Sequence, residues 1–113
     1  MNLAATANEH SHPPLISVCM PVYNTERYIA EAVESILVQT YRDFEFIIID
    51  DGSTDRSLAI LKRYAAQDAR IRLSSRPNAG LVVRLNEMVA EARSDIIAQM
   101  HADDIAIDRK SVV

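Results

Sequence analysis

Four short apolar runs stand out along the chain, and each predicts a β-strand. They cover residues 15–20, 44–49, 71–74 and 95–100. We expect Pro21 to end the first strand, because proline has no N–H group to donate to a central ladder. The run Phe44–Ile49 is almost unbroken, which is typical of a parallel strand that is buried on both faces.

Between these runs, apolar residues recur at helical spacing. They predict the inner faces of three helices: Ile29, Ala32, Val33, Ile36 and Leu37; Leu58, Leu61, Tyr64 and Ala65; and Leu81, Leu85, Met88, Val89 and Ala92. Asn24 or Thr25 is expected to cap the first helix. Ser53 or Thr54 is expected to cap the second.

Strands that alternate with helices predict an α/β fold with an open, mainly parallel sheet and right-handed crossovers. In such sheets, ligands bind at the carboxyl ends of the strands. The loops after the four runs hold the most polar or unusual residues, at 23–24, 50–53, 78–80 and 101–104. We expect these loops, far apart in sequence, to converge on one edge of the sheet.

Two pairs of adjacent carboxylates lie in these loops. Asp50-Asp51 follows the second run, and Asp103-Asp104 follows the fourth. Neighbouring carboxylates repel each other, so we expect a bound cation or a donor-rich ligand to offset the cost. With only two glycines the chain has no glycine-rich phosphate loop. The second pair is therefore predicted to bind Mg²⁺ or Mn²⁺, which in turn would hold a diphosphate.

Composition narrows the classes of function. The 113 residues, 49% of them hydrophobic, predict one folded domain at most. A net charge of -4 argues against nonspecific binding of nucleic acid. No apolar run reaches the roughly 20 residues of a membrane span, and residues 1–14 are interpreted as a mobile leader rather than a signal peptide. A cytoplasmic location is expected, with attachment to the inner membrane face left open. The single cysteine, Cys19, is expected to be a core thiol.

Four segments, in order, resemble the motifs of family 2 glycosyltransferases of the GT-A fold. They are residues 21–24 (Pro-Val-Tyr-Asn), 49–55 (Ile-Asp-Asp-Gly-Ser-Thr-Asp), 78–81 (Asn-Ala-Gly-Leu) and 102–105 (Ala-Asp-Asp-Ile). Residues 35–41 and 85–86 fit as well. The resemblance covers about residues 16–109, and residues 15–113 are interpreted as the N-terminal portion of such a domain.

The resemblance implies inverting transfer of a sugar from a nucleotide diphosphate-sugar to an acceptor hydroxyl, usually with Mg²⁺ or Mn²⁺. It implies that Pro21 and Tyr23 line the nucleoside pocket, and that Asp51 contacts the base, often uracil. Asp103 would lie near the ribose and the metal, and Asp104 would bind the metal and the diphosphate. The acceptor, whether glycan, lipid or protein, stays open.

The chain departs from the family pattern in two ways. His101 stands where the family commonly has an acidic residue, which weakens metal binding, although an imidazole ligand would favour Mn²⁺. The family's general base and acceptor region come from later segments, which these 113 residues do not include, and an inverting transfer needs a base. A noncatalytic nucleotide-binding fragment or partner-dependent module is therefore the alternative. An incomplete domain would leave an unpaired sheet edge, which predicts self-association or a missing C-terminal partner.

A third interpretation, a phospho-acceptor domain of the receiver type, is disfavoured. Such a domain needs an acceptor aspartate at the end of the third strand, where this chain has Ser74 and Ser75.

Several polar residues also have a structural interpretation. Asp50 is expected to orient a turn, and Asp55 to face a helix N-terminus. Gly80 is expected to supply a special backbone angle. Arg84 is predicted to be a solvated surface charge, and Tyr23 has packing on the first helix as its alternative.

Overall fold

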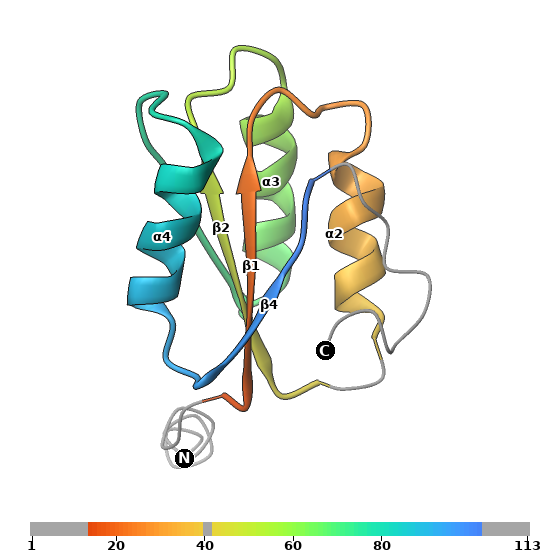
Figure 1. Ribbon diagram of the computed structural model, residues 1–113. Helices are drawn as coiled ribbons and strands as arrows, with labels where there is room; N and C mark the ends of the chain where they lie inside the picture. Colours follow the sequence, from red (N-terminus) through yellow and green to blue (C-terminus); the bar gives the residue numbers. More distant parts are fainter. Residues whose placement is uncertain (1–13, 40–41, 103–113) are drawn as a thin grey trace, which may run out of the picture.

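The computed structural model describes residues 14–39 and 42–102. A parallel four-stranded sheet in the order β3-β2-β1-β4 forms its centre (Figure 1). The strands are β1 (Ile16–Val22), β2 (Phe44–Asp50), β3 (Ile71–Ser75) and β4 (Ile96–Gln99), and the helices are α2 (Ile29–Leu37), α3 (Ser57–Gln67) and α4 (Leu81–Glu91). The predicted open, parallel α/β sheet is confirmed. Most of the predicted leader, and both Asp103 and Asp104, lie outside the described residues.

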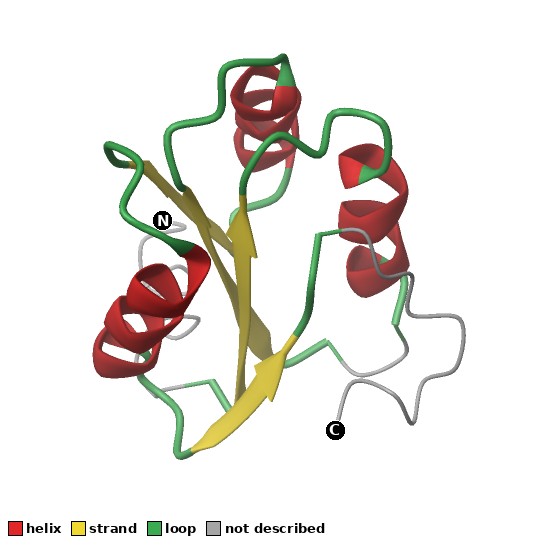
Figure 2. Ribbon diagram, turned by 45° about the horizontal axis from the view of Figure 1, so that its top comes forward, coloured by secondary structure: helices red, strands yellow, loops and turns green. Residues whose placement is uncertain are grey.

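Helices α2 and α3 cover one face of the sheet, and α4 covers the other (Figures 1 and 2). Residues of β1 and β2 alternate between these faces, so the buried apolar residues form two clusters. The larger cluster, under α2 and α3, includes Val18, Met20, Val22, Phe46, Ile48, Ile29, Ala32, Val33, Ile36 and Leu61. The smaller one, under α4, consists of Cys19, Ile47, Ile49 and Met88. None of the helices in this described part is long and apolar enough to cross a membrane.

Cys19 is free and buried, as predicted for a core thiol. Burial, followed by the charges of Glu45 and Glu91, raises the pKa of its thiol to about 11. The thiol therefore stays protonated at neutral pH.

Strand β1 continues through Pro21 to Val22, so the prediction that proline would end it is wrong. The Cys19 carbonyl accepts from the Met100 N–H, whereas the Val22 carbonyl accepts from the Asp51 N–H. The backbone N–H and C=O groups of the odd-numbered residues of β1 therefore point towards β4, and those of the even-numbered residues point towards β2. The last residue of β1 that pairs with β4 is Cys19, so the missing N–H of Pro21 costs no ladder hydrogen bond.

The two helix starts also differ from prediction. α2 begins at Ile29 and α3 at Ser57, and neither N-cap residue has a capping side-chain hydrogen bond. The predicted caps lie in the loops before the helices: Asn24, Thr25, Ser53 and Thr54. Their side chains or backbone groups bond across to the other loop, as described below.

The predicted inner face of α4 is only partly correct. Met88 is buried and Leu85 is half-buried, but Leu81 and Val89 are 41% and 44% exposed. Arg84, predicted to lie at the surface, is buried instead. Among the described helices α4 alone covers its face of the sheet (Figure 1), and several of its apolar side chains stay exposed.

Candidate functional site

The loops after β1, β2 and β3 lie at the carboxyl edge of the sheet, together with the segment that follows β4 (Figure 1). The loops after β2 and β3 approach each other closely at Gly52. Its φ is +76°, and a Cβ atom there would lie 2.7 Å from the Asn78 backbone nitrogen. The tight turn predicted at Gly52 therefore requires glycine. Gly80 also has a positive φ, of +111°, as predicted.

Asp51, only 1% exposed, holds the loop after β3 in place. Its Oδ1 accepts hydrogen bonds from the Ala79 N–H at 2.9 Å and from Arg84 Nε at 2.8 Å. Its Oδ2 accepts from Asn78 Nδ2 at 2.9 Å and from the Gly80 N–H at 3.0 Å. These four donors occupy the lone-pair positions of a carboxylate.

The chain's own donors also keep Asp51 ionised. Burial alone would raise the pKa of its carboxyl group, but the hydrogen bonds from Ala79, Arg84 and Gly80 outweigh burial and lower the pKa below its ordinary value. The cation or ligand expected to relieve the first acidic pair is therefore not needed to stabilise Asp51.

The other member of this pair, Asp50, orients the turn, as predicted. Its Oδ2 accepts from the Ser53 N–H at 3.1 Å and from Ser75 Oγ at 3.4 Å. Asp55 likewise accepts the Ser57 N–H at the start of α3, at 2.8 Å.

Arg84 is the site residue that sequence reasoning placed wrongly. Besides Asp51, its guanidinium contacts Glu87, at 2.8 Å, and the Pro77 carbonyl. A signal for its burial is present in the sequence. Position 84 lies three residues after Leu81 and four before Met88, which puts it on the inner stripe of the helix.

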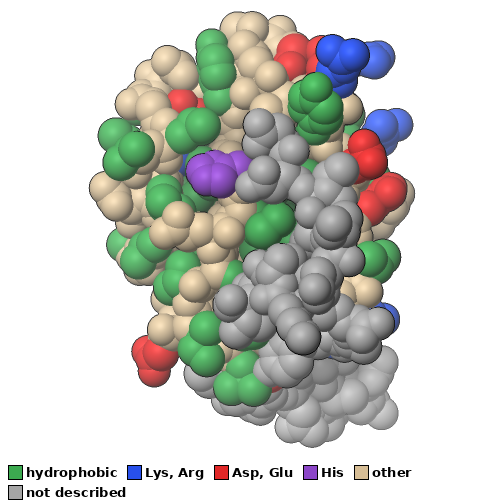
Figure 3. Space-filling view, turned by 45° about the vertical axis from the view of Figure 1, so that its right-hand side comes forward, with side chains coloured by type: hydrophobic (Ala, Val, Ile, Leu, Met, Phe, Trp, Pro, Cys, Tyr) green, Lys and Arg blue, Asp and Glu red, His purple; other side chains and the backbone are tan. Residues whose placement is uncertain are grey.

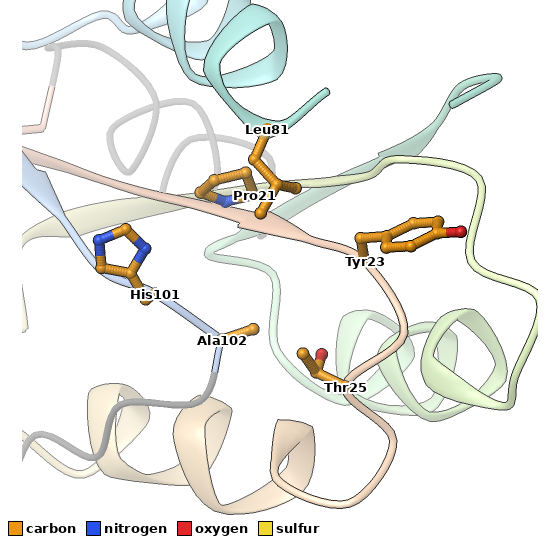
Figure 4. A pocket seen from close by; sticks show the side chains of 6 residues that line it. All are labelled: Pro21, Tyr23, Thr25, Leu81, His101 and Ala102. Atoms are coloured by element: carbon orange, nitrogen blue, oxygen red, sulfur yellow. The ribbon is translucent and has the colours of Figure 1, made fainter. Parts of the chain in front are cut away.

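A pocket of about 180 Å³ opens beside these loops (Figure 4). It is lined by Pro21, Tyr23, Thr25, Leu81, His101 and Ala102. The structure thus brings together the predicted Pro21 and Tyr23, with Tyr23 39% exposed. Asp51 is not among the lining residues. Sequence reasoning did not predict Leu81 here; it is the first residue of α4 and reaches the pocket from the loop after β3.

His101 is exposed and lies at this pocket. From another side, a histidine side chain lies at the surface among hydrophobic ones (Figure 3). Within residues 14–39 and 42–102, no group of three or more His, Cys, Asp or Glu side chains is placed to hold a metal ion. The predicted metal ligands Asp103 and Asp104 lie outside these residues.

The chain matches the model of "Glycosyl transferase family 2" over residues 17–110. It belongs to this family. It is 43% identical over 99 residues to the putative glycosyltransferase EpsE of Bacillus subtilis (strain 168), an alignment covering 86% of this chain and 36% of EpsE. It is 38% identical over 98 residues to the chondroitin synthase of Pasteurella multocida (strain Pm70), covering 86% of this chain and 10% of that protein.

Solved glycosyltransferases share the fold. The 1–349 portion of S. aureus TarS in complex with UDP-GlcNAc superposes with a TM-score of 0.75 at 28% identity, covering 86% of this chain and 28% of that one. The mannosyltransferase PcManGT of Pyrobaculum calidifontis, in complex with GDP-Man and Mn²⁺, gives a TM-score of 0.78 at 21% identity, covering 96% of this chain and 40% of that one. The latter likeness establishes the fold alone. This family 2 domain therefore spans well under half the length of these relatives.

Proposed function

We propose that this family 2 chain is the nucleotide-sugar-binding part of an inverting glycosyltransferase, with a UDP-sugar as donor. The pocket at the carboxyl edge carries the proposal, because it brings Pro21 and Tyr23 together beside the loop that Asp51 fixes. Ligands of parallel α/β sheets bind at this edge. TarS, a relative in fold and sequence, has been solved with UDP-GlcNAc.

The nucleoside is proposed to enter along Tyr23. A half-exposed tyrosine ring offers a flat surface on which uracil can stack, and Pro21 adds an apolar wall. In this proposal Asp51 accepts an N–H group of the base. One of its present donors then has to give way, and the Asn78 amide is the candidate, because it is a side-chain donor on an exposed residue.

A divalent cation, Mn²⁺ or Mg²⁺, belongs to the same proposal. Asp103 and Asp104 directly follow the pocket residue Ala102 in the chain, and they are the proposed ligands, with Asp103 also near the ribose. Carboxylate oxygens suit both cations, and the His101 imidazole as a further ligand would favour Mn²⁺. The cation would neutralise charge on the diphosphate.

A second candidate is a noncatalytic nucleotide-binding fragment or a partner-dependent module. Exposed apolar side chains on α4, namely Leu81, Val82 and Val89, suit the predicted self-association or a C-terminal partner. Transfer to a hydroxyl group of a glycan, lipid or protein acceptor is part of the first proposal. So is a cytoplasmic location, at or near the inner membrane face.

Calorimetric titration of the folded chain with UDP tests the first candidate. We expect heat of binding with Mn²⁺ present, and its loss in EDTA and in Asp104→Ala. The control Asp95→Ala changes an exposed aspartate in the turn before β4, at the opposite edge, and should bind normally. Absence of metal-dependent binding for any nucleoside diphosphate would contradict the proposal. Turnover of a UDP-sugar by this chain alone, abolished by Asp104→Ala, would exclude the second candidate.

A further inference from the structure

The loops that follow β1 and β2 are joined by hydrogen bonds in both directions, a set we call the interloop clamp. Three backbone N–H groups of the first loop donate to side chains of the second loop or of the first residue of α3: Asn24 to Ser53 Oγ (2.9 Å), Thr25 to Ser57 Oγ (2.9 Å) and Glu26 to Asp55 Oδ2 (3.1 Å). Three of the second loop donate to side chains of the first: Thr54 (2.7 Å) and Asp55 (3.3 Å) to Asn24 Oδ1, and Arg56 to Glu26 Oε1 (3.2 Å). Each loop thus satisfies backbone donors of the other.

Asn24 is the centre of the clamp. Like Glu26, it bonds to the second loop through both its N–H and a side-chain oxygen, but its Oδ1 alone accepts two backbone N–H groups of that loop. Its φ is +48°, and no other non-glycine residue in the described part of the chain has a positive φ. Asparagine tolerates this left-handed region better than most residues. Such a conformation persists where the surrounding contacts enforce it.

The clamp lies between two parts of the proposed donor site. Tyr23 and Thr25, which line the pocket, flank Asn24 in the chain. Asp51 stands directly before the second loop and holds the third loop through residues 78–80. The third loop leads into Leu81, which lines the pocket from the other side. The pocket walls are therefore linked in series through Asn24 and Asp51.

We propose that Asn24 is a positioning residue of the donor site, which holds the wall at Tyr23 and Thr25 in register with the loop fixed by Asp51. This inference rests on the proposed function and adds to it a residue that does not line the pocket. Without the side-chain acceptor of Asn24 the two loops separate, and a ligand has to order them on binding, which weakens its affinity.

Two substitutions separate the side chain from the backbone. Asn24→Gly keeps the left-handed backbone but removes the acceptor, and we expect the dissociation constant for UDP with Mn²⁺ to rise about tenfold. Asn24→Asp keeps an oxygen acceptor at the same position and should restore most of the affinity. Glu45→Gln is the control, because it removes a buried charge near the amino edge of the sheet, far from the pocket along β2, and should leave UDP affinity unchanged.

Amide hydrogen exchange provides a readout that needs no ligand. In Asn24→Gly, the Thr25 and Glu26 amides keep their acceptors on the second loop, yet they should exchange about tenfold faster if the clamp acts as a unit. The Ala79 and Gly80 amides, bonded to Asp51, should stay protected.

Each outcome bears on one proposal. If the wild-type chain does not bind UDP, the proposed function fails, and exchange at Thr25 and Glu26 alone decides whether Asn24 holds the pocket wall; unchanged exchange there overturns the inference. Equal UDP affinity of wild type and Asn24→Gly overturns the inference while the proposed function stands. An equal loss in Glu45→Gln would assign the effect to general destabilisation and also overturn it.

Discussion

Two buried carboxylates, Glu45 in strand β2 and Asp51 directly after that strand, tie α4 to the sheet, but the chain stabilises their charges differently. Asp51, at the carboxyl edge, accepts two backbone N–H groups just before α4 and is paired with the buried Arg84. Glu45, near the amino edge, accepts from Arg93, which follows the end of α4. Strand β2 and the residue that follows it thus hold both ends of one helix.

Glu45 is as buried as Asp51, at 2% exposed, and also has four hydrogen bonds. Its Oε2 accepts from Ser17 Oγ at 2.5 Å and from the Arg93 N–H at 2.7 Å. Its Oε1 accepts from Arg72 Nη1 at 2.7 Å and from Arg93 Nε at 3.1 Å. Burial would raise the pKa of Glu45, but the bonds from Ser17, Arg93 and Arg72 lower it below its ordinary value.

The helix dipole explains the difference. A carboxylate near a helix N-terminus is stabilised by the aligned peptide dipoles, whereas one near the C-terminus is not. Asp51 accepts from two backbone N–H groups and one arginine side chain, whereas Glu45 accepts from one backbone N–H group and two arginine side chains. Those arginines are 41% and 51% exposed, for Arg72 and Arg93, so solvent screens them more than Arg84.

The largest effect should come from removing the charge at each end with isosteric substitutions. Asp51→Asn leaves the buried Arg84 facing an amide, so we expect a loss of about 3 kcal/mol in the free energy of unfolding. Glu45→Gln should cost about 1 to 2 kcal/mol, because Arg72 and Arg93 can turn into solvent. Urea denaturation measures both. An equal or larger loss for Glu45→Gln would show that the exposure of the arginines does not decide the outcome.

The loops around Asp51 can be tested by substituting their two glycines, Gly52 and Gly80. Gly52→Ala combines a left-handed backbone with a Cβ atom 2.7 Å from the Asn78 nitrogen, so we expect a loss of about 2 to 3 kcal/mol. Gly80→Ala meets nothing within 4 Å and carries the backbone strain alone, about 1 to 2 kcal/mol. Thermal unfolding shows which variant loses more stability. A smaller loss in Gly52→Ala than in Gly80→Ala would mean that the loop after β3, which Asp51 holds, can shift away from the new Cβ atom.

Acid should reduce the stabilisation that Asp51 and Glu45 provide at the two ends of α4. The folded-state pKa values of Asp51 and Glu45 lie below the ordinary ones, so their stabilisation is present above about pH 4 and is lost as the pH falls through the folded values. Stability measured from pH 7 down to pH 2 should decline less steeply in Asp51→Asn than in wild type. Identical slopes would mean that Asp51 does not contribute to the acid transition.

Salt should produce the smallest effect, and at the Glu45 end alone. We expect Arg72→Gln to cost up to about 1 kcal/mol at low ionic strength and less in 1 M NaCl. The Asp51 end, with its buried arginine and backbone donors, should respond little. Denaturation of Asp51→Asn and Arg72→Gln at two salt concentrations checks this; equal salt sensitivity would remove the distinction between the ends.

Local patterns in the sequence were enough to predict the parallel sheet, its strands and the edge where loops converge. That Pro21 and Tyr23 line one pocket was implied by the resemblance to family 2, not by local pattern. The partners of the buried carboxylates were not predicted, because they lie far along the chain: Arg93 is 48 residues from Glu45, and Arg84 is 33 from Asp51. Charged residues are usually solvated, so Arg84 was assigned to the surface although its position falls on the inner stripe of the helix.

The helix caps were predicted wrongly for a related reason. Asn24 has the side chain of a local cap, and nothing nearby in sequence shows that its oxygen bonds to Thr54, 30 residues away. The prediction that Pro21 ends β1 failed because the missing N–H matters only if β4 pairs that far. The pairing of β1 with β4 stops at Cys19, and the sequence of β1 does not show this. Long-range pairing, rather than local propensity, sets these features.

The single thiol of the chain can serve as a chemical probe for the detachment of α4 from the sheet. Cys19 lies in the cluster that includes Met88 on that helix, and its pKa of about 11 keeps it in the unreactive protonated form. An alkylating reagent can reach it only while the helix is lifted from the strands. The labelling rate then measures how often the helix opens, and comparing it between Asp51→Asn and Glu45→Gln would show which carboxylate holds the helix more firmly.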